Sequence, residues 1–175
     1  MSNISVLIVD DHNIVRQGLR ALLLAEGDIT IVGEAQTGRE AVQAAATLHP
    51  EIVIMDLAMP LLNGWEATRQ ILKATPNAKV IALSSYNNED YIQQAIAAGA
   101  AAYLIKQTAS TDLVKAIREV RCGNAFFSPA IAMTLRTQTC KMGDDADGAQ
   151  PESTPRASVE LTQREAEVLQ LIAEG

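Results

Sequence analysis

Short apolar runs and helix-patterned segments alternate five times along the first 122 residues of this chain. Strands that alternate with helices form parallel sheets, and the helices cover both faces of the sheet. Continuous apolar runs fit such strands, because both of their faces are buried. We therefore predict an α/β fold for residues 1–122, a doubly wound five-stranded parallel sheet. The expected strands lie at residues 4–9, 29–35, 51–55, 78–84 and 101–105.

The segments between these runs repeat their apolar residues at helical spacing. Gly27 is expected to end the first helix, and Ser110 is expected to cap the start of the fifth. The second, third and fourth helices are expected at residues 38–48, 65–74 and 89–98, and the fifth around Leu113, Ile117 and Val120.

Beyond residue 122 the composition changes. Residues 123–136 predict an extra helix, and residues 137–160 are rich in Gly, Pro, Ser and Asp but poor in large apolar residues. A segment of that kind cannot bury enough surface to offset its ordering entropy, so we expect a flexible linker. Residues 161–175 begin with a capping box, Thr162 and Glu165, and predict one amphipathic helix that needs partners.

Polar residues stand at the carboxyl ends of four of the expected strands. Asp10 and Asp11 follow the first strand, Asp56 follows the third, Ser84 closes the fourth and Lys106 follows the fifth. Ligands of doubly wound sheets bind at this edge, so these side chains are expected to form one site.

Three clustered carboxylates require a cation. Two of them ~4 Å apart repel by about 4 kcal/mol at an effective dielectric constant near 20. With no histidine or cysteine expected at this edge, oxygen ligands favour Mg²⁺ over zinc. Beside that ion, Asp56 could act as a nucleophile and form an aspartyl phosphate. Lys106 and Ser84 would then contact the phosphate oxygens.

Four motifs, VLIVDDHNIVRQGL, MDLAMPLLNGWE, IALSSY and GAAAYLIK, together resemble the receiver domain of two-component response regulators, which has a CheY-like, flavodoxin-like fold. The DDH sequence and the segment 161–175 are similar to the NarL/FixJ type, whose output is a LuxR-type helix-turn-helix domain. Residues 161–175 would be the first helix of that all-α domain, which is expected to be truncated here. The resemblance implies a phosphorylation-dependent regulator of transcription, not an enzyme.

The resemblance also implies a role for each acid. Asp56 is the expected phosphoacceptor and a ligand of Mg²⁺. Asp11 is expected to bind the ion directly and Asp10 mostly through water, with the backbone carbonyl of Ala58 completing the protein ligands.

The phosphate-binding and switch residues implied by the resemblance are Lys106, Ser84 and Tyr103. Once phosphate draws Ser84 inward, Tyr103 is expected to turn from solvent toward the sheet. Ala58 and Tyr86 lie two residues beyond Asp56 and Ser84 and are expected to set the lifetime of the phosphate. Ala58 cannot orient water and Tyr86 could shield the phosphate, so slow loss is expected.

The expected phosphoryl donor is a sensor histidine kinase or a small molecule such as acetyl phosphate, and a homodimer is expected on activation. Promoter DNA is expected to bind only through a complete output domain, because the net charge of −7 offers no electrostatic footprint for nucleic acid. The sequence shows no signal peptide and no membrane span, so a cytoplasmic protein is expected, with Cys122 and Cys140 as free thiols.

Two other classes remain as alternatives. A phosphatase of the haloacid dehalogenase type also uses an Asp nucleophile with Mg²⁺, but it needs a second Asp where Ala58 stands. A receiver-like interaction module without phosphate control would be expected to lose an acid or the lysine, and this sequence keeps all of them.

Overall fold

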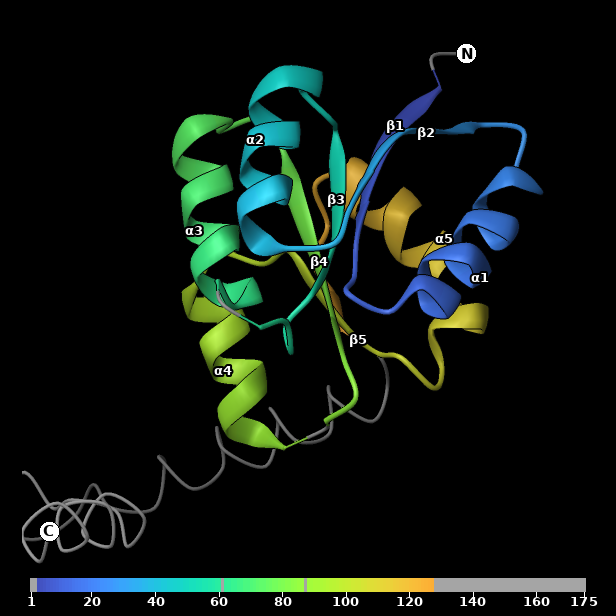
Figure 1. The fold of residues 1–175 in the computed structure, drawn as a ribbon. Coiled ribbons are helices and arrows are strands. Elements are labelled where there is room, and N and C mark those ends of the chain that lie inside the picture. Colours follow the sequence, from blue (N-terminus) through green and yellow to red (C-terminus); the bar gives the residue numbers. More distant parts are fainter. Residues whose placement is uncertain (1–2, 61, 87, 128–175) are drawn as a thin grey trace, which may run out of the picture. The chain divides into compact units, whose positions relative to one another are not determined.

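The computed structural model describes residues 3–60, 62–86 and 88–127. Within these residues, strands and helices alternate along the chain, and the strands form one parallel sheet (Figure 1). The strands are β1 (Ile4–Val9), β2 (Ile29–Ala35), β3 (Ile52–Asp56), β4 (Lys79–Ser84), β5 (Ala102–Ile105) and β6 (Phe126–Phe127). The helices are α1 (Asn13–Leu24), α2 (Gly38–Leu48), α3 (Gly64–Ala74), α4 (Glu89–Ala97) and α5 (Ala109–Arg121). The predicted α/β fold class is confirmed.

Helices cover both faces of the sheet, with α1 and α5 on one side and α2, α3 and α4 on the other (Figure 1). One apolar cluster joins the α1 and α5 face to β1, β3, β4 and β5, and a second joins α2 and α3 to the opposite face. Each fully buried Ile, Leu or Val contributes about 1.5–3 kcal/mol relative to exposure. These two clusters therefore hold the sheet rigidly enough to position the residues at its edge.

The order of the strands is β2-β1-β3-β4-β5-β6. The chain moves outward from β1 to β2 and then returns to the other side of β1 for β3, so the strand order reverses between β1 and β3. Val6 to Val9 pair with Ile52 to Met55 in parallel register. The carboxyl ends of β1 and β3 therefore lie next to each other, at the point where doubly wound folds bind their ligands.

Most of the expected helix ends agree with the structure. Thr37 and Asn63 accept hydrogen bonds from the backbone N–H groups of Glu40 and Glu66, and so cap α2 and α3. The prediction of Ser110 as the cap of α5 was wrong, because α5 already begins at Ala109. The residue before the helix is Thr108, whose hydroxyl donates to the carbonyl of Ile105 (3.2 Å).

A sixth strand was not predicted. Phe126 and Phe127 pair with Ala102 and Tyr103 of β5, where an extra helix over residues 123–136 was expected to begin. Phe126 packs on the cluster under α5, and Phe127 packs beside Tyr103 on the other face. The rest of that expected helix, the linker 137–160 and the segment 161–175 lie outside the described residues.

Two further observations concern the described residues only. No helix among them is long and apolar enough to cross a bilayer. Cys122, at the end of α5, is exposed and carries a free thiol.

Candidate functional site

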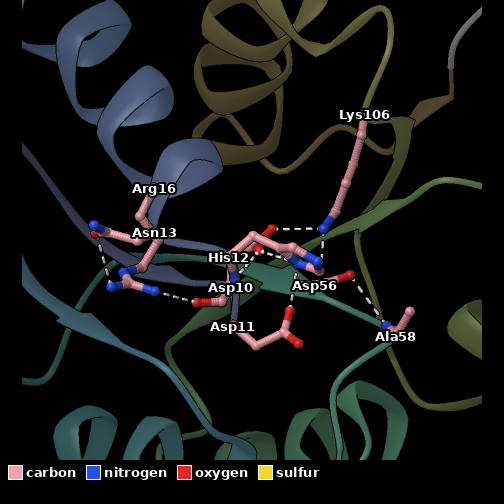
Figure 2. A network of polar contacts seen from close by, with 8 residues as sticks. All are labelled: Asp10, Asp11, His12, Asn13, Arg16, Asp56, Ala58 and Lys106. Carbon is pink, nitrogen blue, oxygen red and sulfur yellow. Dashed lines mark hydrogen bonds and ion pairs between the residues drawn. The ribbon is translucent and has the colours of Figure 1, made fainter.

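The acids expected at the sheet edge lie together (Figure 2). Asp10 and Asp11 follow β1, and Asp56 is the last residue of β3. One possible ligand atom from each of these acids and from His12 lies within 4.8 Å of the others. Asp10 and Asp56 are fully buried, so their charges need partners.

Lys106 is the cation that meets two of these acids. Its Nζ lies 2.6 Å from Oδ2 of Asp10 and 2.8 Å from Oδ2 of Asp56. The backbone N–H of Lys106 also donates to the carbonyl of Ser84 (2.8 Å), which fixes the chain as it leaves β5. Figure 2 shows the lysine side chain reaching toward both carboxylates. The lysine is therefore fixed at both its backbone and its ammonium group.

The electrostatics of Asp56 and Lys106 follow from burial and from this contact. Burial raises the pKa of Asp56, and the negative charge of Asp10 acts in the same direction. Hydrogen bonds from Lys106 and from the backbone of Ala58 offset only part of that rise. For Lys106, burial acts to lower the pKa, but the hydrogen bonds to Asp10 and Asp56 outweigh it and the pKa is raised. The lysine thus stays charged at neutral pH.

The loop after β3 orients Asp56. The backbone N–H of Ala58 donates to Oδ1 of Asp56 (3.1 Å), and the N–H of Gly64 donates to the carbonyl of Leu57 (3.3 Å). A Cβ atom at Gly64 would lie 2.2 Å from the carbonyl oxygen of Asp56, which is far closer than a Cβ approaches a non-bonded atom in proteins. Gly64 is therefore needed where α3 begins against the acid. Sequence reasoning missed this role, although Gly64 stands in the quoted motif MDLAMPLLNGWE.

Ser84, Tyr86 and Tyr103 form a connected set beside the acids. The backbone N–H of Tyr86 donates to the hydroxyl of Ser84 (3.0 Å), and the hydroxyl of Tyr103 donates to the carbonyl of Tyr86 (2.8 Å). Tyr103 is fully buried, and this burial raises the pKa of its hydroxyl. The structure thus has Tyr103 turned toward the sheet, which is the orientation expected only after phosphate arrives.

Two residues beyond the acid pair, His12 before α1 and Arg16 in its first turn, were not predicted as part of the site. Nδ1 of His12 lies 2.7 Å from Oδ1 of Asp11, so the expectation that no histidine reaches this edge was wrong. Arg16 is 5% exposed, and its Nη1 donates to the backbone carbonyl of Asp10 (2.8 Å). The available signal was their place in the motif VLIVDDHNIVRQGL, where His12 directly follows the acid pair and Arg16 stands four residues later.

The donor set fits Mg²⁺. Within the described part of the chain, Oδ2 of Asp10 and Oδ2 of Asp56 are buried and have the ammonium of Lys106 as their polar partner, so both oxygens can still accept a further ligand. Carboxylate oxygens with room for water are the ligands that Mg²⁺ prefers. Ala58 stands two residues after Asp56, beyond the end of β3, and contacts the acid through its backbone N–H.

Comparison with known proteins shows which family has these sequence and structural features. The model of the response regulator receiver domain matches residues 6–118. The transcriptional regulatory protein LiaR of Bacillus subtilis is 38% identical over 172 residues, which cover 98% of this chain and 77% of LiaR.

Two solved structures extend the comparison. A LuxR-family two-component response regulator from Aurantimonas is 32% identical with a TM-score of 0.76, covering 79% of this chain and 99% of that one. A structure of RcsB dimers bound to DNA is 26% identical with a TM-score of 0.71, covering 99% of this chain and 78% of that one.

Proposed function

Because the chain belongs to the response regulator receiver domain family, we propose that it accepts a phosphoryl group on Asp56 in a Mg²⁺-dependent reaction. The observation that carries the proposal is the contact of Lys106 with both Asp10 and Asp56 at the carboxyl edge of the sheet. A cation held against a buried acid is the arrangement needed to balance the charge of an incoming phosphate.

Asp10, Asp11, Asp56 and the carbonyl of Ala58 would hold the ion. When bound, Mg²⁺ would neutralise negative charge on the carboxylates and on the phosphoryl group. An oxygen of Asp56 then forms the new bond to phosphorus as the bond between phosphorus and the donor breaks, and the donor leaves with the electron pair. Lys106 pairs with a phosphate oxygen, and the hydroxyl of Ser84 donates to another. The expected donors are a sensor histidine kinase and acetyl phosphate.

Ser84, Tyr86 and Tyr103 would transmit the phosphorylation signal. The Ser84 hydroxyl can donate to a phosphate oxygen while it accepts from the N–H of Tyr86, so a movement of Ser84 toward phosphate would draw the Tyr86 backbone with it. The carbonyl of Tyr86 is the acceptor for Tyr103, so a shift of that loop reaches the tyrosine directly. Phosphate would thereby stabilise the inward orientation of Tyr103 that the structure already has.

Ala58 and Tyr86 would set how long the phosphate lasts. Ala58 offers no side-chain group to orient an attacking water molecule. Tyr86 is 51% exposed, its ring lies 5.0 Å from that of Tyr91, and its backbone N–H donates to the hydroxyl of Ser84. We infer slow loss of phosphate, with Tyr86 acting as a shield.

The output would be control of transcription in the cytoplasm, through a homodimer that forms on activation. The names of the relatives support this output, since LiaR is a transcriptional regulatory protein and the RcsB structure contains dimers on DNA. Promoter DNA would bind through a complete output domain. A phosphatase is disfavoured, because Ala58 takes the place of the required second acid.

Intact-mass measurement after incubation with acetyl phosphate tests the proposal. The wild-type chain should gain one phosphoryl group with Mg²⁺ and none with EDTA, and Asp56→Asn should gain none under either condition. Labelling that does not require Mg²⁺, or full labelling of the variant, would show that the site works differently.

A further inference from the structure

A buried arginine lies beneath the acid site and plays no part in the reaction described above. Arg16, on the first turn of α1, is 5% exposed. A guanidinium group taken out of water is costly unless polar partners surround it. Its partners are the carbonyl of Asp10 (2.8 Å from Nη1) and Oδ1 of Asn13 (3.2 Å from Nη2), and its Nε lies 3.5 Å from Oε2 of Glu34.

The shortest of these contacts reaches the centre of the site. The carbonyl of Asp10 belongs to the peptide bond that joins Asp10 to Asp11, so a hydrogen bond to it anchors the backbone from which both carboxylates extend. Arg16 holds the carbonyl, and the N–H of His12 holds Oδ1 of Asp10 (2.8 Å). Figure 2 shows Arg16 reaching Asp10 from α1, whereas Lys106 approaches from β5.

We propose that Arg16 is a positioning residue for the Mg²⁺ site, acting through the Asp10–Asp11 peptide. The inference rests on the proposed function, because it concerns the same ion. Two effects of Arg16 oppose each other: its positive charge repels Mg²⁺, and its hydrogen bond orients two of the carboxylates that bind the ion. Removal of an outer hydrogen-bond partner of this kind typically weakens metal binding about 10- to 100-fold. The orienting effect is the stronger one.

The contacts also require arginine specifically. One planar guanidinium reaches the Asp10 carbonyl and the Asn13 side chain at once, through two different nitrogens. The single ammonium of a lysine keeps the charge but cannot reproduce that fork. Arg16→Lys therefore separates geometry from charge, and Arg16→Met removes both.

Calorimetric titration with Mg²⁺ tests the inference on the full chain. Arg20→Met is the matched control, because Arg20 lies one turn along α1 and pairs with the same Glu34 (3.0 Å) rather than with Asp10. We expect the Kd for Mg²⁺ to rise at least about tenfold in Arg16→Lys, to rise less in Arg16→Met because the repelling charge is also gone, and to stay within about twofold in Arg20→Met. In the two Arg16 variants, the rate of phosphorylation by acetyl phosphate at saturating Mg²⁺ should fall by a much smaller factor than the affinity for Mg²⁺.

Asn13→Ala provides a second test that does not disturb the core, since Asn13 is exposed. It removes one acceptor of the guanidinium and should raise the Kd about two- to threefold. Unchanged or tighter Mg²⁺ binding in Arg16→Met, or wild-type affinity in Arg16→Lys, would overturn the inference, as would a lower Tm with no change in Kd. A wild-type chain that binds no Mg²⁺ would instead overturn the proposed function, and this inference with it.

Discussion

Lys106 should contribute to stability in a way that depends on Mg²⁺, and Lys106→Met tests this. The side chain of Lys106 is 16% exposed and lies 2.6 Å from Asp10 and 2.8 Å from Asp56, both fully buried. At an effective dielectric constant near 20, each of these contacts has a gross attraction of about 6 kcal/mol. Most of this is offset by the cost of burying the charges. Breaking a buried pair by removing one partner typically costs about 3–5 kcal/mol.

We therefore expect Lys106→Met to lose about 3 kcal/mol of unfolding free energy at pH 7.5 in EDTA. Removing the lysine also removes hydrogen bonds that hold down the pKa of Asp56, which is already raised by burial. An acid with a raised pKa in the folded state contributes stability that is present below its unfolded pKa, about 3.9, and is lost as the pH rises through the folded value. The deficit of the variant should thus shrink as the pH falls from 7.5 toward about 4.

Urea denaturation with and without Mg²⁺ measures both effects. Because Mg²⁺ can supply the missing positive charge, it should stabilise Lys106→Met more than the wild type. Lys79→Met is the control, since Nζ of Lys79 donates to the carbonyls of Val120 and Arg121, away from the acids. Its loss of stability should not change with Mg²⁺. Equal stabilisation of Lys106→Met and wild type by Mg²⁺, or no loss in EDTA, would refute the reasoning.

Three further predictions concern neighbouring residues. Asp56→Asn should be more stable than the wild type in EDTA at pH 7.5, because it removes a buried acid whose pKa is raised. In urea denaturation, this difference in unfolding free energy should vanish as the pH falls toward about 4. Gly64→Ala should lose at least ~2 kcal/mol of unfolding free energy, because the added Cβ clashes with the carbonyl oxygen of Asp56. Gly18→Ala is the control and should be neutral or stabilising, because a Cβ at Gly18 has no atom within 4 Å. Ser84→Ala should still gain phosphate by intact mass but show no phosphate-dependent change of oligomeric state by light scattering, and a wild-type response would exclude Ser84 as the relay.

The strands and the acids could be predicted because their signals are local. The apolar runs are long enough to be recognised as strands, and Asp10, Asp11, Asp56, Ser84 and Lys106 stand at their ends. A parallel sheet brings such ends to one edge whatever the details of packing. Their convergence therefore required no knowledge of distances.

Features that depend on contacts between distant segments were missed. A strand of two residues such as β6 carries no periodicity, and it exists because β5 offers a free edge to Phe126 and Phe127. Gly64 is required only because α3 begins against the carbonyl of Asp56. The error at Ser110 has a local cause instead, since Thr108 uses its hydroxyl on Ile105 and α5 starts one residue before the expected cap.

The identity of the phosphorylated residue tests the central claim most directly. Borohydride reduces an aspartyl phosphate to homoserine, so peptide mass mapping after reduction identifies the acid that carried the phosphate. After treatment with acetyl phosphate and Mg²⁺, we predict homoserine at Asp56 alone. Homoserine at Asp10, at Asp11 or at an exposed acid, with Asp56 unmodified, would contradict the account.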